Sequence, residues 1–269
     1  MRKFLMLPTA GIVLSSILLS SPAHAVVGGV ELDEDTRAAA FGPLVALEVD
    51  KPGTDDDLME VCGGVKIKED TVLTAAHCVA NETGTFKRIS VRGNSLNFLE
   101  GGVTADATRM IPHTKFDPAS LENDIALLKF SPEALDGIPA AALPSSPADT
   151  AQPAILTGWG LTEDGQLPQT GNARAASLRV AGTGGECKTG YDMPPTVFCM
   201  NSQDPELAMG SGQGDSGSPV WQERDGKMTV VGVDSWATHG PEGPFVRRGD
   251  STIATQVTDY LNWIATAAN

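Results

Sequence analysis

Hydrophobic and polar residues alternate along short stretches of this chain, with the period of two that is typical of half-buried β-strands. The run 62–68 alternates in this way, and 71–74 follows it as a second short strand. Glycine-rich turns, such as Gly101 with Gly102, separate the runs. The pattern predicts further strands at 41–50, 89–92, 103–111, 123–130, 154–160, 176–181, 197–200, 228–236 and 251–256, and a short closing helix at about 257–266.

The number and spacing of these strands indicate the fold class. Many short strands at even spacing, with Gly/Pro turns and one terminal helix, predict an all-β sandwich or a pair of barrels. Residues 131–153 are rich in Pro, Ala and Ser, and we interpret them as the linker between two halves. No internal repeat is visible beyond the shared strand pattern.

The first 25 residues form a separate unit, which we interpret as a secretory signal peptide. Arg2 and Lys3 precede an apolar run over residues 4–19, and Ala-His-Ala at 23–25 is a small-x-small cleavage site. A membrane anchor is the alternative, but the apolar run is short for a bilayer span. We therefore expect an exported chain, extracellular or periplasmic, that is not bound to a membrane once the signal is removed.

Composition and charge restrict the partners. The chain has 269 residues, 41% of them hydrophobic, which is enough for one large domain or two small ones. It carries 34 Asp and Glu against 19 Lys and Arg, and loss of Arg2 and Lys3 with the signal leaves a net charge of −17. Such a charge excludes nucleic acid and anionic membranes as partners and favours cationic substrates. We expect a monomer.

Four cysteines remain after the signal: Cys62, Cys78, Cys187 and Cys199. Export brings them into an oxidising compartment, and four cysteines allow three pairings, among which the sequence alone does not choose. Zinc is the competing interpretation, with His77 beside Cys78. Adjacent ligands are poor spacing, and the chain has no CxxC or HxxxH motif. We therefore favour two disulfides and expect no metal and no cofactor.

The segment 210–219, Gly-Ser-Gly-Gln-Gly-Asp-Ser-Gly-Ser-Pro, surrounds Ser216 with glycines and has no strand or helix periodicity. Glycine permits unusual backbone angles, so such a turn can aim two N–H groups at one point beside a serine hydroxyl. That geometry holds an oxyanion during acyl transfer. A surface turn rich in Gly and Ser is the alternative interpretation.

A serine hydroxyl is a poor nucleophile without a base, so the chain has to supply a histidine and a group that orients it. His24 leaves with the signal, His113 follows Pro112 in a predicted loop, and His239 lies in a Gly/Pro-rich turn. His77 alone ends a predicted strand among small residues, next to a cysteine. Asp124 begins an apolar strand, where a carboxylate is costly unless it is paired. These three side chains, His77, Asp124 and Ser216, are the candidate catalytic group.

Three motifs, in this order, resemble the signatures of the chymotrypsin/trypsin-like serine endopeptidases. They are Thr-Ala-Ala-His-Cys at 74–78, Asn-Asp-Ile-Ala-Leu at 123–127 and Gly-Asp-Ser-Gly-Ser-Pro at 214–219. Val-Val-Gly-Gly at 26–29, Cys-Gly-Gly at 62–64, Thr-Gly-Trp-Gly at 157–160 and Ser-Trp at 235–236 also fall where that family has counterparts.

The resemblance covers residues 26–269 as one peptidase domain. It implies two antiparallel six-stranded β-barrels with the active site in the cleft between them. We expect the first barrel at about 40–135, the second at about 150–256, and the C-terminal helix at about 257–266.

The resemblance also implies roles for individual residues. Ser216 attacks the scissile carbonyl, His77 transfers the proton to the leaving amine, and Asp124 orients the imidazole. The N–H groups of Gly214 and Ser216 hold the oxyanion. By the same resemblance, one disulfide (Cys62–Cys78) braces the loop that holds His77, and the other (Cys187–Cys199) ties a loop beside the specificity pocket. The implied partners are protein or peptide substrates.

The predicted specificity pocket departs from the family pattern. Ser235 and the backbone of Trp236 line the edge where an extended substrate adds, and Ala237 replaces a glycine at the entrance. Gly210 occupies the pocket base, where trypsins carry aspartate. Asp234 falls in the pocket wall, and we expect its carboxylate to pair with Arg or Lys of the substrate. The alternative is an Asp234 that is turned to a backbone partner and leaves a neutral pocket.

Two further departures leave the catalytic residues in place. Ser218 follows the Ser-Gly pair where the family often has glycine, and Gly212 stands where many members have a cysteine, so the bridge that braces their pocket is missing.

Family members become active when a new N-terminal amine pairs with the aspartate before the nucleophile. Signal cleavage after Ala25 exposes Val26, so the resemblance implies an ion pair between Val26 and Asp215 with no propeptide between. Two rival functions remain: a catalytically silent homologue that binds proteins, and an esterase. The Gly-x-Ser-x-Gly elbow of esterase folds does not fit, because Ser218 stands at its fifth position.

Overall fold

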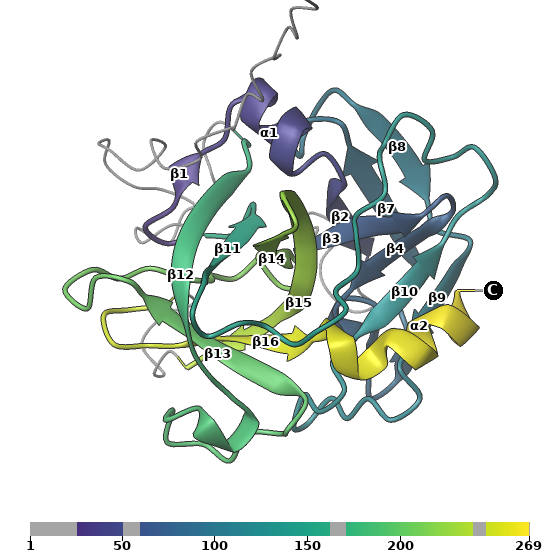
Figure 1. Cartoon of the computed structure of the whole chain (residues 1–269). Coiled ribbons are helices and arrows are strands. Elements are labelled where there is room, and N and C mark those ends of the chain that lie inside the picture. The colour runs from purple at the N-terminus through teal and green to yellow at the C-terminus, as the bar shows by residue number, and fades with distance from the viewer. Residues whose placement is uncertain (1–25, 51–59, 162–170, 239–245, 269) are drawn as a thin grey trace, which may run out of the picture.

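The computed structural model describes residues 26–50, 60–161, 171–238 and 246–268, so the predicted signal peptide at 1–25 and His239 lie outside it. The described residues fold into two large antiparallel β-sheets and a two-stranded ribbon, with helix α1 (Glu34–Ala40) near their start and helix α2 (Leu261–Ala267) near their end (Figure 1). One hydrophobic cluster takes residues from both large sheets, and a second lies within the closed barrel. The predicted all-β fold class is confirmed. The first sheet differs from the expected closed six-stranded barrel, because it curls only into a half-barrel.

The second half is a closed barrel of six strands. In order around the barrel they are β12 (Arg174–Thr183), β11 (Pro153–Gly158), β14 (Pro219–Arg224), β15 (Lys227–Ala237), β16 (Thr252–Gln256) and β13 (Val197–Ser202). Pairing of β13 with β12 closes the ring. The short strand β1 (Val30–Glu31) extends β12, with Val30 opposite Ala175. The beginning of the described chain is therefore hydrogen-bonded to the second half.

The first half is a sheet with two free ends. Its order is β8 (Val103–Asp106), β7 (Arg88–Gly93), β2 (Leu44–Asp50), β3 (Glu60–Lys68), β4 (Thr71–Thr74), β10 (Ala126–Lys129) and β9 (Arg109–Pro112). A separate two-stranded ribbon consists of β5 (Ala80–Asn81) and β6 (Gly84–Thr85).

The sheet curls into a half-barrel because its two end strands follow each other in the chain. Only Ala107 and Thr108 separate β8 from β9. The N–H of Ala107 donates to Ile89 of β7 at 2.9 Å, and that of Thr108 donates to Lys129 of β10 at 2.7 Å. The prediction of one strand at 103–111 therefore corresponds to two pieces, joined by a bend that crosses from one edge of the sheet to the other.

Burial alternates along the strands as the sequence pattern predicts. In β12 the side chains of Ala176, Leu178 and Val180 are buried, while the residues between them are partly or fully exposed. Successive side chains of a strand point to opposite faces, so every second residue enters the barrel interior. Phe198 and Leu156 fill the same interior from neighbouring strands.

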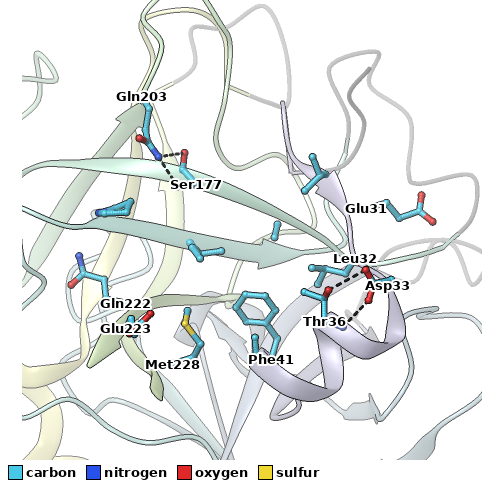
Figure 2. A pocket seen from close by; sticks show the side chains of 15 residues that line it. Glu31, Leu32, Asp33, Thr36, Phe41, Ser177, Gln203, Gln222, Glu223 and Met228 are labelled. Carbon is cyan, nitrogen blue, oxygen red and sulfur yellow. Dashed lines mark hydrogen bonds between the residues drawn. The ribbon is translucent and has the colours of Figure 1, made fainter. Parts of the chain in front are cut away.

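Helix α1 is an element that the sequence pattern did not predict. Asp33 caps it, because its carboxylate accepts a hydrogen bond from the N–H of Thr36 at 2.7 Å. A cavity of about 390 Å³ lies between α1, β11 and β12, and Phe41, Ile155 and Met228 are among its apolar walls (Figure 2). The helix was missed because it has seven residues, which is too short for a hydrophobic period to show.

The predicted linker, 131–153, is held to the first half by a buried lysine. Lys66 is 6% exposed, and its ammonium donates to the carbonyls of Leu135 and Ile138 at 2.9 and 2.7 Å. Ala142 then pairs with Thr229 of β15 as an isolated bridge. The linker therefore connects the two halves through fixed contacts with each of them.

The C-terminal helix packs on the first half. A short 3₁₀ turn, Val257–Tyr260, leads into α2. The His113 ring lies edge-on against Tyr260 and Trp263, with ring centroids 5.2 and 5.0 Å apart. Partial burial, with a smaller contribution from Lys115, lowers the pKa of His113. His113 is thus a packing residue that anchors the helix. No described helix has the length and apolarity that crossing a bilayer requires.

Candidate active site

His77 follows strand β4 in a single 3₁₀ turn (Ala76–Cys78), and a disulfide between Cys62 and Cys78 ties this turn to β3. Its backbone N–H donates to Oδ1 of Asp124 at 2.9 Å, and its ring Nδ1 lies 2.7 Å from Oδ2 of the same carboxylate. A carboxylate only accepts, so Nδ1 carries the proton and Nε2 is left with a free lone pair. The ring is oriented as a base, and its side chain remains 24% exposed.

Asp124 is fully buried just before β10. The hydroxyl of Ser235 donates to its Oδ2 at 2.5 Å, as a third donor beside the two from His77. Thr255 donates to its backbone carbonyl at 3.0 Å. A buried carboxylate is tolerated when it is hydrogen-bonded in this way. The preceding residue, Asn123, has φ of 56°.

Ser235 therefore has a contact that sequence reasoning did not find. We expected it only at the edge of the pocket, which it does line. Its bond to Asp124 spans 111 positions of the chain, so no local pattern could have indicated it.

The Ser216 loop is pressed against the first half through glycines. Gly217 has φ of 78°, and a Cβ there would lie 2.2 Å from Oγ1 of Thr74 and 2.5 Å from the carbonyl of Gly63. The N–H of Gly63 donates to the carbonyl of Ser216 at 2.7 Å. Because β4 ends at Thr74, three residues before His77, this contact brings the serine loop beside the histidine turn. Among the hydrogen bonds of the described residues, none joins the Ser216 hydroxyl to His77.

Two N–H groups of this loop are free of protein acceptors. Those of Asp215, Gly217 and Ser218 all donate to backbone carbonyls. Those of Gly214 and Ser216 donate to no atom of the described residues. Gly214 has φ of 99°, which its lack of a side chain permits. Free N–H groups beside a serine hydroxyl are able to bind an oxygen anion.

Asp215 is enclosed by backbone. Its two carboxylate oxygens accept from the N–H groups of Gly160 and Gly212 at 2.8 and 2.9 Å. A Cβ on Gly158 would lie 2.2 Å from Oδ1 of Asp215, so the carboxylate is accommodated here only because residue 158 has no side chain. Burial outweighs the two donors and raises the pKa of Asp215 to about 7. The site is one that a positive charge would stabilise.

The first described residues, which begin at Val26, lie next to this loop. Val26 and Val27 are completely buried, and Val26 packs into the core of the second barrel. The carbonyl of Val27 accepts from the N–H of Gly210 at 3.0 Å. The first two residues after the predicted signal peptide are therefore inside the fold, and the second of them, Val27, is hydrogen-bonded to the loop that carries Ser216.

A cavity of about 270 Å³ opens beside Ser216. Four of the predicted pocket residues line it, namely Asp234, Ser235, Trp236 and Ala237, together with Gly212, noted above for its missing cysteine, and with Ser211 and Gln213, which we did not single out. Their place in the chain, between Gly210 and Gly214, was the available signal. Gly210 itself is buried against Thr252, where a Cβ would lie 2.4 Å from the threonine hydroxyl.

Asp234 is the ionisable residue among those that line this cavity. It is 2% exposed, and its buried Oδ1 has no hydrogen-bond partner among the described residues. Burial, and then the charge of Asp215, raise the pKa of Asp234 well above its ordinary value.

The second disulfide, between Cys187 and Cys199, ties the segment after β12 to β13. These cysteines pack with Ile253, and Trp236 lies against the same small cluster. Tyr191 meets the Trp236 ring edge-on at a centroid distance of 5.6 Å. The disulfide thus supports one wall of the cavity. The described part of the chain contains no group of three or more His, Cys, Asp or Glu side chains arranged to hold a metal ion.

A family profile, curated relatives and a solved structure all match this chain over most of its length. A family profile described as Trypsin matches residues 34–264. Trypsin-4 of Rattus norvegicus is 31% identical over 216 residues, which cover 78% of this chain and 80% of the relative. Chymotrypsin-like elastase family member 1 of Canis lupus familiaris is 32% identical over 249 residues, covering 89% and 90%. A solved structure titled HL collagenase matches with a TM-score of 0.73 and 25% identity, over 90% of this chain and 98% of that one.

Proposed function

The chain belongs to the trypsin family of serine endopeptidases, and from this premise we propose that Ser216, His77 and Asp124 form its catalytic triad. The observation that carries the proposal is the pair of hydrogen bonds from His77 to Asp124. One carboxylate holds both the backbone N–H and the ring Nδ1 of the same histidine. That arrangement presents Nε2 as a base, which is the state that a serine nucleophile requires.

Catalysis then proceeds through an acyl-enzyme. His77 Nε2 takes the hydroxyl proton as Ser216 Oγ attacks the scissile carbonyl, and the N–H groups of Gly214 and Ser216 stabilise the oxyanion. The proton on His77 passes to the leaving amine as the peptide bond breaks. Water attacks the ester in the second half-reaction, with His77 again as the base. Asp124 holds the imidazole in place and stabilises the imidazolium.

The substrate is a protein or peptide that binds in extended form. Strand β15 ends at Ala237, directly after Ser235 and Trp236 in the cavity wall. A substrate strand added along the backbone of these residues would bring one side chain into the cavity next to Ser216. Asp234 lies in that wall and is our candidate for the residue that determines which side chain is accepted.

Activation follows from export in this proposal. Removal of residues 1–25 would convert Val26 into an N-terminal ammonium, which pairs with Asp215. Two observations support it: Val27 is already bonded to Gly210, and Asp215 is buried without a cationic partner among the described residues. Two disulfides agree with an oxidising, extracellular location. The secreted protein would be active as a monomer without a further protease.

Labelling with a serine-directed fluorophosphonate tests the triad, together with hydrolysis of a peptide library by the purified, secreted protein. We expect one label per chain and cleavage of internal peptide bonds. Ser216→Ala and His77→Ala should each remove nearly all activity, on the order of a millionfold, because triad members act as a unit. Circular dichroism checks that both variants fold. A protein that neither labels nor cleaves would be a silent homologue, and one that cleaves esters but no peptide would be an esterase.

A further inference from the structure

The outer face of the second barrel is incompletely covered beneath helix α1. Ile155 on β11 and Ala175 on β12 are half-buried and face away from the barrel interior, because the residues on either side of each alternate with them. Phe41, just after α1, and Met228 of β15 complete the apolar walls of the cavity of about 390 Å³ (Figure 2). We call this space the α1 cavity.

The α1 cavity has the size and the walls of a small-molecule site. Small residues leave the space open, since Ala40 at the end of α1 and Ala175 and Ser177 on β12 all line it. Its volume of about 390 Å³ lies within the range of roughly 300–1,000 Å³ that is usual for ligand pockets. An apolar body placed here would remove its own surface and that of the half-buried walls from water, which is favourable.

The side-chain amides in the walls are already hydrogen-bonded within the protein. Nε2 of Gln203 donates to the carbonyl and the hydroxyl of Ser177 at 3.2 and 2.5 Å (Figure 2). Nε2 of Gln222 donates to the carbonyls of Asp149 and Gln152 at 2.9 and 3.2 Å, and its Oε1 accepts from the N–H of Asp149 at 2.9 Å. A polar group of a ligand therefore has to find its partner among the charged side chains.

The ionisable side chains that line the α1 cavity are all carboxylates, namely those of Glu31, Asp33 and Glu223. Arg174 pairs with Glu31 at 3.2 Å. Hydrogen bonds from the N–H and the hydroxyl of Thr36 lower the pKa of Asp33, which keeps it ionised. The carboxylate of Glu223 is exposed and has no hydrogen bond or ion pair within the part of the chain that the structure describes. The lining thus carries a negative charge, and Glu223 is free to pair with a cation.

We propose that the α1 cavity binds a small cationic amphiphile, an amine or guanidine on an apolar body of about the size of a phenylalkyl chain. The apolar body lies between Phe41, Ile155 and Met228, and the cation pairs with Glu223. An anion of the same shape is disfavoured by the carboxylates of the lining. The α1 cavity shares no lining residue with the cavity beside Ser216, so this site goes beyond the proposed endopeptidase function and does not depend on it.

A methyl signal inside the α1 cavity reports its occupant directly. The secreted protein is prepared with isotope-labelled methionine methyl groups, and Met228→Leu identifies the Met228 resonance. Phenylbutylamine, phenylbutanol and phenylbutanoate share one apolar body and differ in charge. We expect the amine to shift the Met228 resonance saturably. The alcohol should bind roughly two- to fivefold more weakly than the amine, since an exposed ion pair contributes little, and the acid about tenfold more weakly.

Variants locate the ligand. Ala175→Leu fills the α1 cavity and should weaken binding of the amine by more than about tenfold. Ala40→Leu is a second filling variant, used if the first does not fold. Glu223→Gln should weaken binding of the amine by roughly two- to fivefold and leave that of the alcohol unchanged. Asp225→Asn is the matched control, because it removes a carboxylate from the same β14–β15 hairpin at an exposed residue outside the lining, with φ of 51°, which asparagine tolerates.

The outcomes separate the possible occupants. No saturable shift of the Met228 resonance up to the solubility limit of the amine overturns the site, and equal affinities of the three probes overturn the preference for a cation. A shift that persists in both filling variants places the ligand elsewhere and refutes the proposal. If the Met228 resonance instead changes with protein concentration and sedimentation shows a dimer, a second copy covers the cavity and the proposal is wrong. None of these measurements requires peptide cleavage, so failure of the endopeptidase proposal is recognised separately by the fluorophosphonate.

Discussion

The hydroxyl of Ser235 donates to Oδ2 of Asp124 at 2.5 Å, and this is the same oxygen that lies 2.7 Å from Nδ1 of His77. One oxygen of a fully buried carboxylate therefore accepts from both the serine hydroxyl and the histidine ring. Ser235 comes from β15 of the second barrel, while His77 and Asp124 belong to the first half. The bond thus connects the orientation of the histidine to the strand that lines the substrate cavity.

Replacement of Ser235 by alanine should lower kcat with a smaller effect on KM. A hydrogen bond to a charged group contributes about 1.5–3 kcal/mol, and its loss leaves Asp124 less firmly held. We expect a decrease in kcat of roughly ten- to a hundredfold, measured by steady-state kinetics, with partial recovery in Ser235→Thr. Ser218→Ala is the matched control, because Ser218 is buried and its hydroxyl has no partner. Equal losses in the two alanine variants would contradict a positioning role.

Gly217→Ala should destabilise the fold and remove activity. The new Cβ would lie 2.2 Å from Oγ1 of Thr74, so the serine loop has to move away from the first half. Gly226→Ala is the control at nearly the same backbone angle, with φ of 75° and no atom within 4 Å of the added Cβ. It should cost only the strain of the left-handed backbone, about 1–2 kcal/mol. Urea unfolding and peptide hydrolysis are measured on both variants. The excess loss in Gly217→Ala over Gly226→Ala is the effect of the steric clash, because both variants carry the same backbone strain.

An N-terminal extension should make stability fall as pH rises. With Met-Ala placed before Val26, Asp215 has no ammonium partner, and its folded pKa is about 7 against an unfolded value of 3.8. A raised folded pKa means that the folded state keeps a proton that the unfolded state loses. The corresponding stability is complete below about pH 4 and decreases until about pH 7, by about 4 kcal/mol.

The chain that starts at Val26 should lack this decrease, because its ammonium pairs with the ionised Asp215. Chemical denaturation of the two forms from pH 4 to pH 8 measures the difference, and Asp215→Asn in the extended form should abolish it. The contribution of Asp234 is common to both forms and cancels. Parallel curves, or a fully active form with the extension shown to be in place, would refute the proposed activation.

Lys66→Met should destabilise the connection between the halves. Methionine fills a similar volume but leaves the carbonyl of Ile138 without its donor, while that of Leu135 keeps only the N–H of Ile138 at 3.2 Å. A buried polar group that loses its partner costs about 1–3 kcal/mol, and we expect a loss of that size in the free energy of unfolding. Lys227→Met, at an exposed position of β15, is the control. Catalytic constants of the folded fraction should stay unchanged, since Lys66 contacts no residue of the site.

The sequence by itself determined the class of the fold and the residue types of the site. Alternation with a period of two is a local property of a strand, so β3, β7 and β12 could be predicted from their own residues. The order of the motifs around His77, Asp124 and Ser216, and the glycines of the serine loop, are also written along the chain. Each of these inferences needs only neighbouring residues or the comparison of short segments with a family.

Only the tertiary structure decided how distant residues meet. The bond of Ser235 to Asp124, the enclosure of Asp215 by Gly158 and Gly160, and the unpaired Oδ1 of Asp234 depend on contacts between segments that folding brings together. The same is true of pKa values, because burial and neighbouring charges are properties of the folded chain. The seven-residue α1 was also missed, since its stability comes from a cap and from packing on the barrel rather than from a repeating pattern.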